Sequence, residues 1–292
     1  MMGLQFVKGY RNNETLRNSF NQLSQQIFGI NFESWYKAGF WIDKYEPYSY
    51  IDDHQVVANV SVNKIDLILH KEHKRGIQIG TVMTHLDYRG QGLSKRLMNK
   101  VLEDFADYDF IYLFANQSVL NFYPKFGFMP MKEVQYFLDF ENDPAVSAPF
   151  RKLDVRHPAD LSFIFEFASI RIPISRKFGT VNVQELLMFY CMYVFRDDIY
   201  FFEEDRVLVI AQNEGHTLHV FDIISVEELD IKKIIYSLTL PASNRIVFHF
   251  TPDYAGIRFK KELLEDTNVL FVRSNNQSVW PKDVKHPITS QA

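Results

Sequence analysis

A glycine turn between a predicted strand and a predicted helix constrains this chain more than any other feature of its sequence. Residues 77–84 are rich in Ile, Val and Thr and predict a strand. Residues 93–105 place Leu, Met, Val and Phe on one helical stripe. The turn at 88–92 reads Tyr-Arg-Gly-Gln-Gly. Because glycine lets the backbone approach a ligand closely, and a helix N-terminus presents unpaired N–H groups, this junction predicts an anion site.

The turn differs from two well-known phosphate-binding sequences. Lys95 stands where a dinucleotide-binding GxGxxG sequence has its third glycine, and no GxxxxGK[ST] sequence occurs. Taken alone, a Gly-x-Gly turn is more typical of a plain strand-to-helix connection than of a phosphate site. Its function therefore has to be inferred together with other motifs.

Predicted strands and helices alternate along the first half of the chain. Apolar residues spaced by three and four predict a helix at 15–28, and Val-rich alternation predicts a strand at 55–62. The uninterrupted apolar run at 110–115 is typical of a strand buried on both faces. A helix is expected at 118–126 and a closing strand at 134–140. This order predicts a mixed α/β fold, with helices flanking a central mixed sheet.

Two segments together resemble the acetyl-CoA-binding motifs of the GNAT N-acetyltransferase superfamily. The first runs from Gln78 to Ser94 and includes Arg-Gly-Gln-Gly-Leu-Ser, which is similar to the family's Arg/Gln-x-x-Gly-x-Gly/Ala signature. The second runs from Asn116 to Phe128 and includes Phe-Tyr-Pro-Lys-Phe-Gly-Phe. The two occur in the family's order, and the resemblance is strongest over residues 50–140. Ser94 departs from the Gly or Ala of the signature.

The resemblance implies a role for each matching residue. Backbone amides around Val82 and Met83 would pair with the pantetheine arm of acetyl-CoA, as an added strand pairs with a sheet edge. Asn116, at the end of its predicted strand, would lie beside that arm. The pyrophosphate would be held by the amides of one turn, formed by Arg89, Gly90, Gln91, Gly92, Leu93 and Ser94.

The resemblance makes Tyr123 the general acid that protonates the departing thiolate. A phenol has an ordinary pKa of about 10, comparable to or above that of a thiol, which allows this proton transfer. The alternative is that Tyr123 only packs beneath the acetyl-CoA. No general base can be assigned from the sequence, although acidic and His side chains occur near two predicted strand ends: Asp52, Asp53, His54, His85 and Asp87.

The first fifty residues correspond in position to the family's variable acceptor-binding region. They are dense in aromatic residues that could line an acceptor pocket: Trp35, Tyr36, Trp41, Tyr45 and Tyr48. Asp43 or Glu46 could attract a cationic amine there. The alternative is that these aromatic side chains cover one edge of the sheet.

Residues 141–149 contain two prolines and several small residues, and they predict a linker. We therefore divide the chain into 1–145, a catalytic GNAT domain, and 146–292. The second part repeats the order of elements, with strands at 217–224, 245–250 and 269–272 and helices at 226–238 and 256–264. It lacks the glycine turn, so we interpret it as a degenerate GNAT-like domain without a pyrophosphate site. An unrelated α/β domain is the alternative.

Composition excludes several classes of function. The net charge is -4, and neither half is basic, which argues against a nucleic-acid partner. The single cysteine, Cys191, lies in an aromatic segment and excludes an intrachain disulfide framework. The His and Cys positions show no zinc-ligand spacing, so no metal is expected. No signal peptide and no membrane-length apolar run is visible, so we expect a cytoplasmic protein without a membrane partner.

The sequence therefore predicts an acetyl-CoA-dependent N-acetyltransferase that acts on a primary amine. The acceptor is expected to be a small molecule, and its identity, like the oligomeric state, stays open. The alternative is a non-catalytic acyl-CoA-binding sensor or interaction protein. A transferase that uses charged tRNA is disfavoured, because neither half carries a basic stripe.

Overall fold

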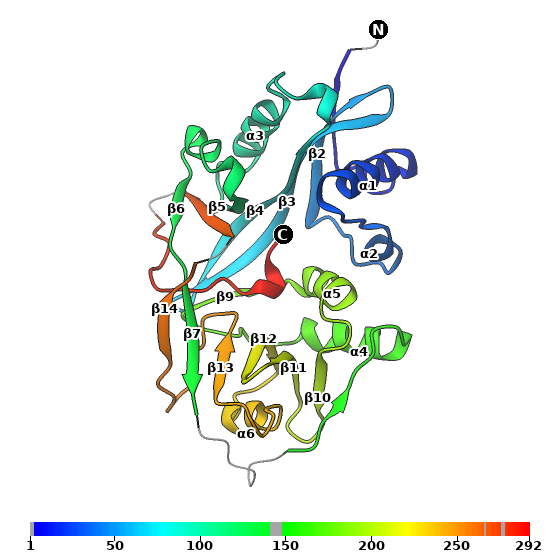
Figure 1. Cartoon of the computed structure of the whole chain (residues 1–292). Coiled ribbons are helices and arrows are strands. Elements are labelled where there is room, and N and C mark those ends of the chain that lie inside the picture. Colours follow the sequence, from blue (N-terminus) through cyan, green and yellow to red (C-terminus); the bar gives the residue numbers. More distant parts are fainter. Residues whose placement is uncertain (1–2, 141–147, 266, 276–277) are drawn as a thin grey trace.

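A computed structural model describes residues 3–140, 148–265, 267–275 and 278–292 of the chain. It contains two mixed sheets, one above the other in Figure 1, each with helices on both faces. The expected mixed α/β class with helices flanking its sheets is thereby confirmed. No helix among these residues is long and apolar enough to cross a membrane.

The first sheet follows the order β1-β2-β3-β4-β5-β15-β6, and β9 pairs with the far end of β3. Its only parallel pair within the described chain is β4 with β5. Its strands are β1 (Gln5–Lys8), β2 (Tyr45–Asp52), β3 (Gln55–Leu69), β4 (Glu72–Thr84), β5 (Phe110–Asn116), β6 (Met129–Met131), β9 (Phe178–Val181) and β15 (Asn268–Ser274).

Opposite faces of the first sheet are covered by different helices. On one face lie α1 (Glu14–Phe28) and α2 (Glu33–Lys37), whose apolar side chains share a core with Tyr45 and Met83. On the other face lies α3 (Leu93–Asp104), which buries its apolar stripe against the alternate strand residues. A short 3₁₀ turn, η1 (Leu86–Tyr88), lies between β4 and α3. Two others, η2 (Gln117–Val119) and η3 (Tyr123–Phe126), replace the helix expected at 118–126.

The second sheet follows the order β14-β7-β13-β12-β11-β10-β8, with β12 and β13 parallel. Its strands are β7 (Val134–Asp139), β8 (Arg151–Lys152), β10 (Ile199–Phe202), β11 (Val207–Glu214), β12 (Thr217–Ser225), β13 (Arg245–Phe248) and β14 (Lys260–Leu263). One face carries α4 (Pro158–Ser169) and α5 (Gln184–Tyr193), and the other carries α6 (Ile231–Tyr236). The core beneath α4 and α5 is continuous with the core beneath α1 and α2, so it joins the two units.

The two sheets exchange strands. β7 was expected to close the first sheet, but it pairs with β13 and β14 in the second. Its place in the first sheet is taken by β15, which pairs with β5 over seven residues. Because each sheet takes a strand from the other part of the chain, neither part contains a complete sheet. The predicted linker at 141–149 lies largely outside the described residues.

Two further expectations for the second half need correction. The helix predicted at 256–264 is wrong, because Lys260–Leu263 forms β14, an exposed edge strand paired with β7. The helix predicted at 226–238 covers only Ile231–Tyr236, where Asp230 accepts a hydrogen bond from Lys232 N and caps the first turn. Pairing with a distant strand outweighs local spacing in the first case, and the cap sets the start of the helix in the second.

Candidate functional site

The parallel strands β4 and β5 separate part-way along their length. They pair from Gly76 opposite Phe110 to Ile79 opposite Leu113, with no further pairs between them. In the next stretch β4 bulges, because two residues, Thr81 and Val82, stand opposite one residue of β3. Thr81 has a positive φ of 49°, in a region where bulges commonly re-aim backbone groups at functional sites.

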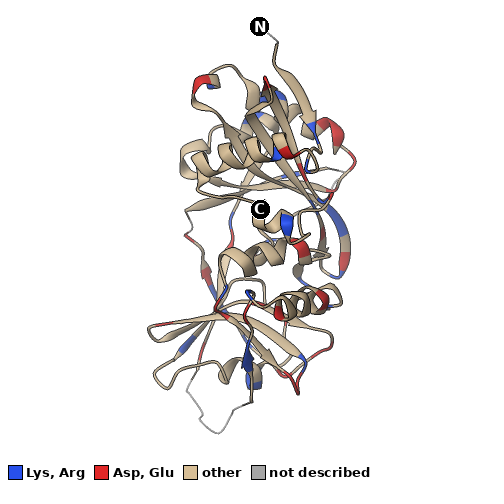
Figure 2. Ribbon diagram, turned by 90° about the vertical axis from the view of Figure 1, so that its right-hand side faces the viewer, with Lys and Arg blue, Asp and Glu red and all other residues tan. Residues whose placement is uncertain are grey.

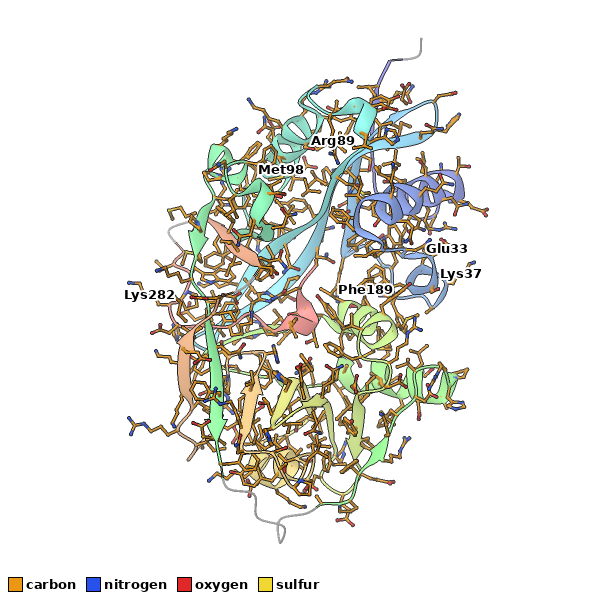
Figure 3. The ribbon with its side chains drawn as sticks, viewed as in Figure 1. Glu33, Lys37, Arg89, Met98, Phe189 and Lys282 are labelled. Atoms are coloured by element: carbon orange, nitrogen blue, oxygen red, sulfur yellow. The ribbon has the colours of Figure 1, made fainter. Side chains whose placement is uncertain are left out.

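A cavity of about 1190 Å³ fills this opening. It is larger than the roughly 300–1,000 Å³ typical of a single small-ligand pocket, so it has room for two reactants. Both separated strand ends line it, together with the start of α3, the η3 turn and residues of α1, α2 and α5. Arg89, beside α3, and Phe189, on α5, mark two well-separated parts of its wall (Figure 3).

The N-terminus of α3 opens into the cavity. Gly92 caps the helix with φ at 72°, and the first helical hydrogen bond runs from Arg96 N to Gly92 O at 3.1 Å. The N–H groups of the preceding three residues therefore have no partner within the helix. These residues, Leu93, Ser94 and Lys95, all line the cavity. The predicted glycine turn thus places a helix N-terminus, with its unpaired N–H groups, at the wall.

The same part of the wall is cationic. Arg89, Lys95 and Lys125 line the cavity, whereas none of its described lining residues is Asp, Glu or His. Elsewhere on the molecule the two signs of charge are interspersed over both units (Figure 2). Unpaired N–H groups and cations at one place on a wall favour a negatively charged ligand. Lys95 and Lys125 were not assigned from the sequence, although Lys95 directly follows the first motif and Lys125 lies within the second.

The structure places eight of the nine predicted acetyl-CoA-binding residues in the cavity wall. They are Val82, Met83, Arg89, Gly90, Gly92, Leu93, Ser94 and Asn116. The ninth, Gln91, does not line the cavity, and its amide lies 3.5 Å from the Asp87 carbonyl. The Ser94 hydroxyl is hydrogen-bonded to the Thr84 hydroxyl at 2.7 Å, which ties the first turn of α3 to the end of β4.

Asn116 acts locally as a cap at the end of β5. Its Oδ1 accepts hydrogen bonds from Ser118 N at 3.1 Å and from the Ser118 hydroxyl at 2.5 Å. These bonds stabilise the turn that leads to η3. Asn116 therefore lies at the cavity wall with its side-chain oxygen already engaged in the fold.

Tyr123 lies at the start of η3 and is only 5 % exposed. Its ring contacts Phe128 and Phe271, with centroids 6.2 and 5.8 Å away. Its hydroxyl makes no hydrogen bond with the described residues, and the side chain lines the cavity. Burial raises the pKa of Tyr123 to about 12, so the phenol carries its proton throughout the neutral range.

The candidates for a general base do not reach the cavity. His85 and Asp87 face each other at 3.7 Å, and Asp52 accepts a 2.7 Å hydrogen bond from the Tyr88 hydroxyl. None of the five acidic and His side chains lines the wall: Asp52, Asp53, His54, His85 and Asp87. The arrangement offers a proton donor, Tyr123, without a side-chain base among the described lining residues.

The aromatic residues singled out among residues 1–50 divide into those that line the cavity and those that do not. Trp35 and Tyr45 line the cavity, as the pocket interpretation expected. Trp41 and Tyr48 belong to the cores and do not line the cavity, and Tyr36, also outside the lining, stacks on the Arg17 guanidinium. For these three, the packing interpretation fits better.

The expected cationic attraction by Asp43 or Glu46 is wrong. Neither residue lines the cavity, because Asp43 pairs with Arg11 at 3.2 Å and Glu46 pairs with Lys64 at 3.7 Å. Sequence proximity to the aromatic residues suggested this role. Asp43 lies in the turn before β2 and Glu46 lies on β2, and both carboxylates pair with neighbouring cations instead.

The second part of the chain contributes wall residues that the sequence did not indicate. Leu186, Phe189 and Tyr190 of α5 line the cavity, as do Gln291 and Ala292. The Tyr190 hydroxyl donates a 2.8 Å hydrogen bond to the Gln291 carbonyl. The chain segment at 291–292 thus lies between α5 and β4 (Figure 1).

The opened parallel pair, the helix end and the cavity define an α/β protein of the N-acetyltransferase fold class. Residues 11–131 match the family model described as an acetyltransferase (GNAT) domain. One curated relative is an uncharacterized N-acetyltransferase, ycf52, of Gracilaria tenuistipitata var. liui. It is 42 % identical over 53 residues, which cover 18 % of this chain and only 29 % of that protein.

Solved structures share the fold over nearly the whole chain. A conserved protein of Enterococcus faecalis V583, described as a probable N-acyltransferase, is 13 % identical with a TM-score of 0.61, covering 94 % of this chain and 72 % of its own. A GCN5-related N-acetyltransferase of Kribbella flavida is 14 % identical with a TM-score of 0.57, covering 93 % and 72 %. Eis1 of Mycobacterium abscessus is 12 % identical with a TM-score of 0.56, covering 92 % and 72 %. These similarities concern the fold.

Proposed function

We propose that this protein is an acetyl-CoA-dependent N-acetyltransferase that acetylates a primary amine. The observation that carries the proposal is one cavity shared by three features. These are the N-terminus of α3 with its cations, the separated end of β4, and the protonated Tyr123. The GNAT domain match at 11–131 supports the same reaction class. A small-molecule acceptor and a cytoplasmic location belong to this proposal.

In the proposed reaction the amine nitrogen attacks the thioester carbonyl carbon. A C–N bond forms, the C–S bond breaks, and the products are an acetamide and free CoA. The proton lost by the amine passes to water, and the Tyr123 phenol supplies a proton to the leaving thiolate. Backbone N–H groups at the Val82 bulge would stabilise the negative oxygen of the tetrahedral intermediate.

The raised pKa of Tyr123 bears on this proton transfer. A phenol with a pKa of about 12 is a weak donor to a thiolate in water. Burial raises thiol pKa values as well, as it does for Cys191 in this protein. A thiolate released beside Tyr123 would experience the same apolar surroundings. The two pKa values therefore shift in the same direction, so the gap between donor and acceptor is smaller than the raised pKa of Tyr123 alone suggests.

We further propose that residues 1–145 carry the cofactor chemistry and that 146–292 form a degenerate GNAT-like partner. The parallel pair of β12 and β13, connected through α6, resembles the parallel pair of β4 and β5 connected through α3. No glycine stands between Ser225 and Ile231, where the first part has its glycine turn. Through α5, the second part would complete the acceptor side of the cavity.

The test is direct detection of both products. The full-length chain is mixed with acetyl-CoA and a panel of primary amines. Free thiol is followed with a chromogenic disulfide, and the acetamide is followed by mass spectrometry. We expect equal amounts of thiol and acetamide. Tight acetyl-CoA binding without either product would favour the non-catalytic sensor, and absence of binding would refute both functions.

A further inference from the structure

The far end of the cavity carries a set of aromatic rings that we name the aromatic wall: Phe32, Trp35, Tyr45 and Phe189. Phe32 stacks on Tyr45 with centroids 5.6 Å apart and on Phe189 at 5.5 Å. Trp35 meets Tyr45 edge-on at 5.6 Å. Further apolar residues continue the wall, namely Ile27, Phe28, Ile30 and Leu186.

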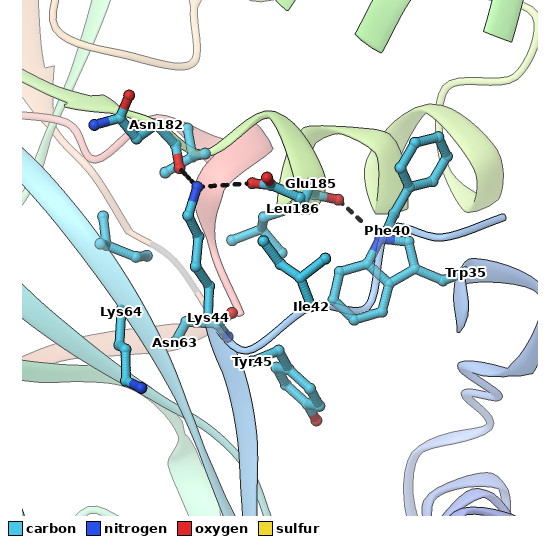
Figure 4. Close-up of a pocket in the computed structure, with 12 residues that line it drawn as sticks. Trp35, Phe40, Ile42, Lys44, Tyr45, Asn63, Lys64, Asn182, Glu185 and Leu186 are labelled. Atoms are coloured by element: carbon cyan, nitrogen blue, oxygen red, sulfur yellow. Dashed lines mark hydrogen bonds and ion pairs between the residues drawn. The ribbon is translucent and has the colours of Figure 1, made fainter. Parts of the chain in front are cut away.

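Two acidic residues on the helices that carry the aromatic wall, Glu33 of α2 and Glu185 of α5, pair with cations. Glu185 is 8 % exposed, and its carboxylate binds Lys44 at 3.0 Å, as Figure 4 shows. Glu33 binds Arg17 at 2.9 Å. Neither carboxylate lines the cavity. The described side chains of this wall therefore offer no negative charge to a cationic acceptor.

One polar side chain at this end has no partner within the fold. Asn63, on β3, lines the cavity and is 4 % exposed, and its Nδ2 has no hydrogen-bond partner. An unpartnered buried amide is costly unless a ligand or water binds it. The two ends of an amide exchange by a half-turn, so Asn63 can also present its carbonyl oxygen. That oxygen can accept an amine N–H and leave the nitrogen lone pair free for attack.

We infer that the acceptor is a monoamine carried on an aromatic or aliphatic body, bound by the aromatic wall and oriented by Asn63. This inference rests on the proposed function. An apolar site favours the neutral form of an amine, which is the nucleophilic form, so no side-chain base is needed. A polyamine would bring further charges into a wall whose side chains have no carboxylate to pair with them.

The experiment compares 2-phenylethylamine with spermidine, using the full chain. Thiol release at subsaturating amine gives kcat/KM with acetyl-CoA, and saturation-transfer NMR reports amine binding without acetyl-CoA. We expect 2-phenylethylamine to exceed spermidine in kcat/KM by about tenfold or more, because unpaired charges are costly to desolvate. Only 2-phenylethylamine should show binding.

Two variants each replace an exposed apolar residue with Asp, one in the cavity lining and one outside it as a control. Phe28→Asp introduces a carboxylate at the exposed mouth of the cavity, where Phe28 is 41 % exposed. Ile170→Asp does so at a residue that is 61 % exposed and outside the lining. Phe28→Asp should lower kcat/KM for 2-phenylethylamine and raise kcat/KM for spermidine. Ile170→Asp should leave the ratio of the two kcat/KM values unchanged. Asn63→Leu should lower kcat/KM for 2-phenylethylamine by about tenfold.

Spermidine preferred by the native chain, or no binding of 2-phenylethylamine, would overturn the inference. The inference would also be overturned if octanoyl-CoA, but not acetyl-CoA, displaced 2-phenylethylamine. That result would mean that the aromatic wall binds the acyl chain of the acyl donor instead of the amine. These outcomes are separable from failure of the proposed function. That failure appears as absent acetyl-CoA binding, while the NMR measurement still decides on the amine.

Discussion

The ring of Phe271 packs against the ring of Tyr123, with centroids 5.8 Å apart and planes tilted by 44°. Phe271 belongs to β15, the strand that the C-terminal part of the chain adds to the first sheet beside β5. The proposed proton donor is therefore positioned by a residue from the other part of the chain. Strand exchange thus connects the fold of both parts to the chemistry of one site.

Removal of the Tyr123 hydroxyl tests its proposed role. Tyr123→Phe retains the ring contacts with Phe128 and Phe271 but has no proton to donate. We expect kcat to fall by about 10²–10⁴-fold, the usual contribution of a general acid, with acetyl-CoA affinity unchanged. Steady-state kinetics and calorimetric titration measure the two quantities. Tyr108→Phe, outside the cavity, should behave as the native chain, and an active Tyr123→Phe would assign the residue to packing.

The role of β15 can be tested by truncating Phe271. Phe271→Ala should lower the free energy of unfolding by about 3–5 kcal/mol, as expected for a buried Phe. Because it also removes the contact that orients Tyr123, kcat should fall at temperatures where the variant is fully folded. Phe248→Ala is the matched control, since Phe248 is 0 % exposed in the core of the second sheet. Equal kcat values in Phe271→Ala and Phe248→Ala would show that β15 does not contribute to catalysis through Tyr123.

The cations at the cavity wall should bind phosphate oxygens of acetyl-CoA. Lys95→Ala and Lys125→Ala should each weaken binding by about 1 kcal/mol, and the remaining affinity should depend less on salt. Titration calorimetry at two ionic strengths measures both effects. Lys100→Ala is the control, because Lys100 lies over the Phe6 ring at 4.4 Å and does not line the cavity. A loss as large in Lys100→Ala would mean that general charge, not the site, binds the ligand.

His286 predicts how stability depends on pH. Its ring is fully buried, with Nδ1 3.0 Å from the Pro287 carbonyl and Nε2 3.1 Å from the Tyr112 hydroxyl. Burial lowers the pKa of His286 from 6.5 to about 3. Between these values the unfolded chain binds one proton more than the folded chain, so stability falls as pH falls. The slope from this residue is about 1.4 kcal/mol per pH unit.

Denaturant unfolding at pH 5 and pH 7 measures this dependence. In His286→Gln the side chain stays neutral, so the free energy of unfolding should change with pH by about 1.4 kcal/mol per pH unit less than in the native chain. His73→Gln, at an exposed position, should leave the slope as it is. An unchanged slope in His286→Gln would show that the ring titrates equally in both states.

Local sequence signals predicted the centre of the site and missed its surroundings. The strand, glycine turn and helix at 77–105 are specified by neighbouring residues, so their pattern predicted β4, the turn and α3. The exchange of β7 and β15 depends on pairing between distant segments, which periodicity does not report. For the same reason, the sequence did not show that Phe189 lines the cavity. It also suggested that Asp43 attracts a cationic amine, whereas the fold pairs Asp43 with Arg11.

The central claim is that acetyl-CoA binds at the N-terminus of α3, and thermal unfolding with and without acetyl-CoA tests it most directly. At about 100 times its dissociation constant the ligand should stabilise the native chain by about 2.7 kcal/mol. Gly92→Glu places a carboxylate at the anion site and should abolish this shift. Gly215→Glu is the matched control, since Gly215 also has a positive φ, of 57°, with no atom near its added Cβ.

Both glycine variants should lose stability by about 1–2 kcal/mol, the cost of a left-handed backbone for a non-glycine residue. The account predicts that acetyl-CoA stabilises the native chain and Gly215→Glu, and that it leaves Gly92→Glu unchanged. Absence of stabilisation in the native chain, or equal stabilisation of Gly92→Glu, would contradict it.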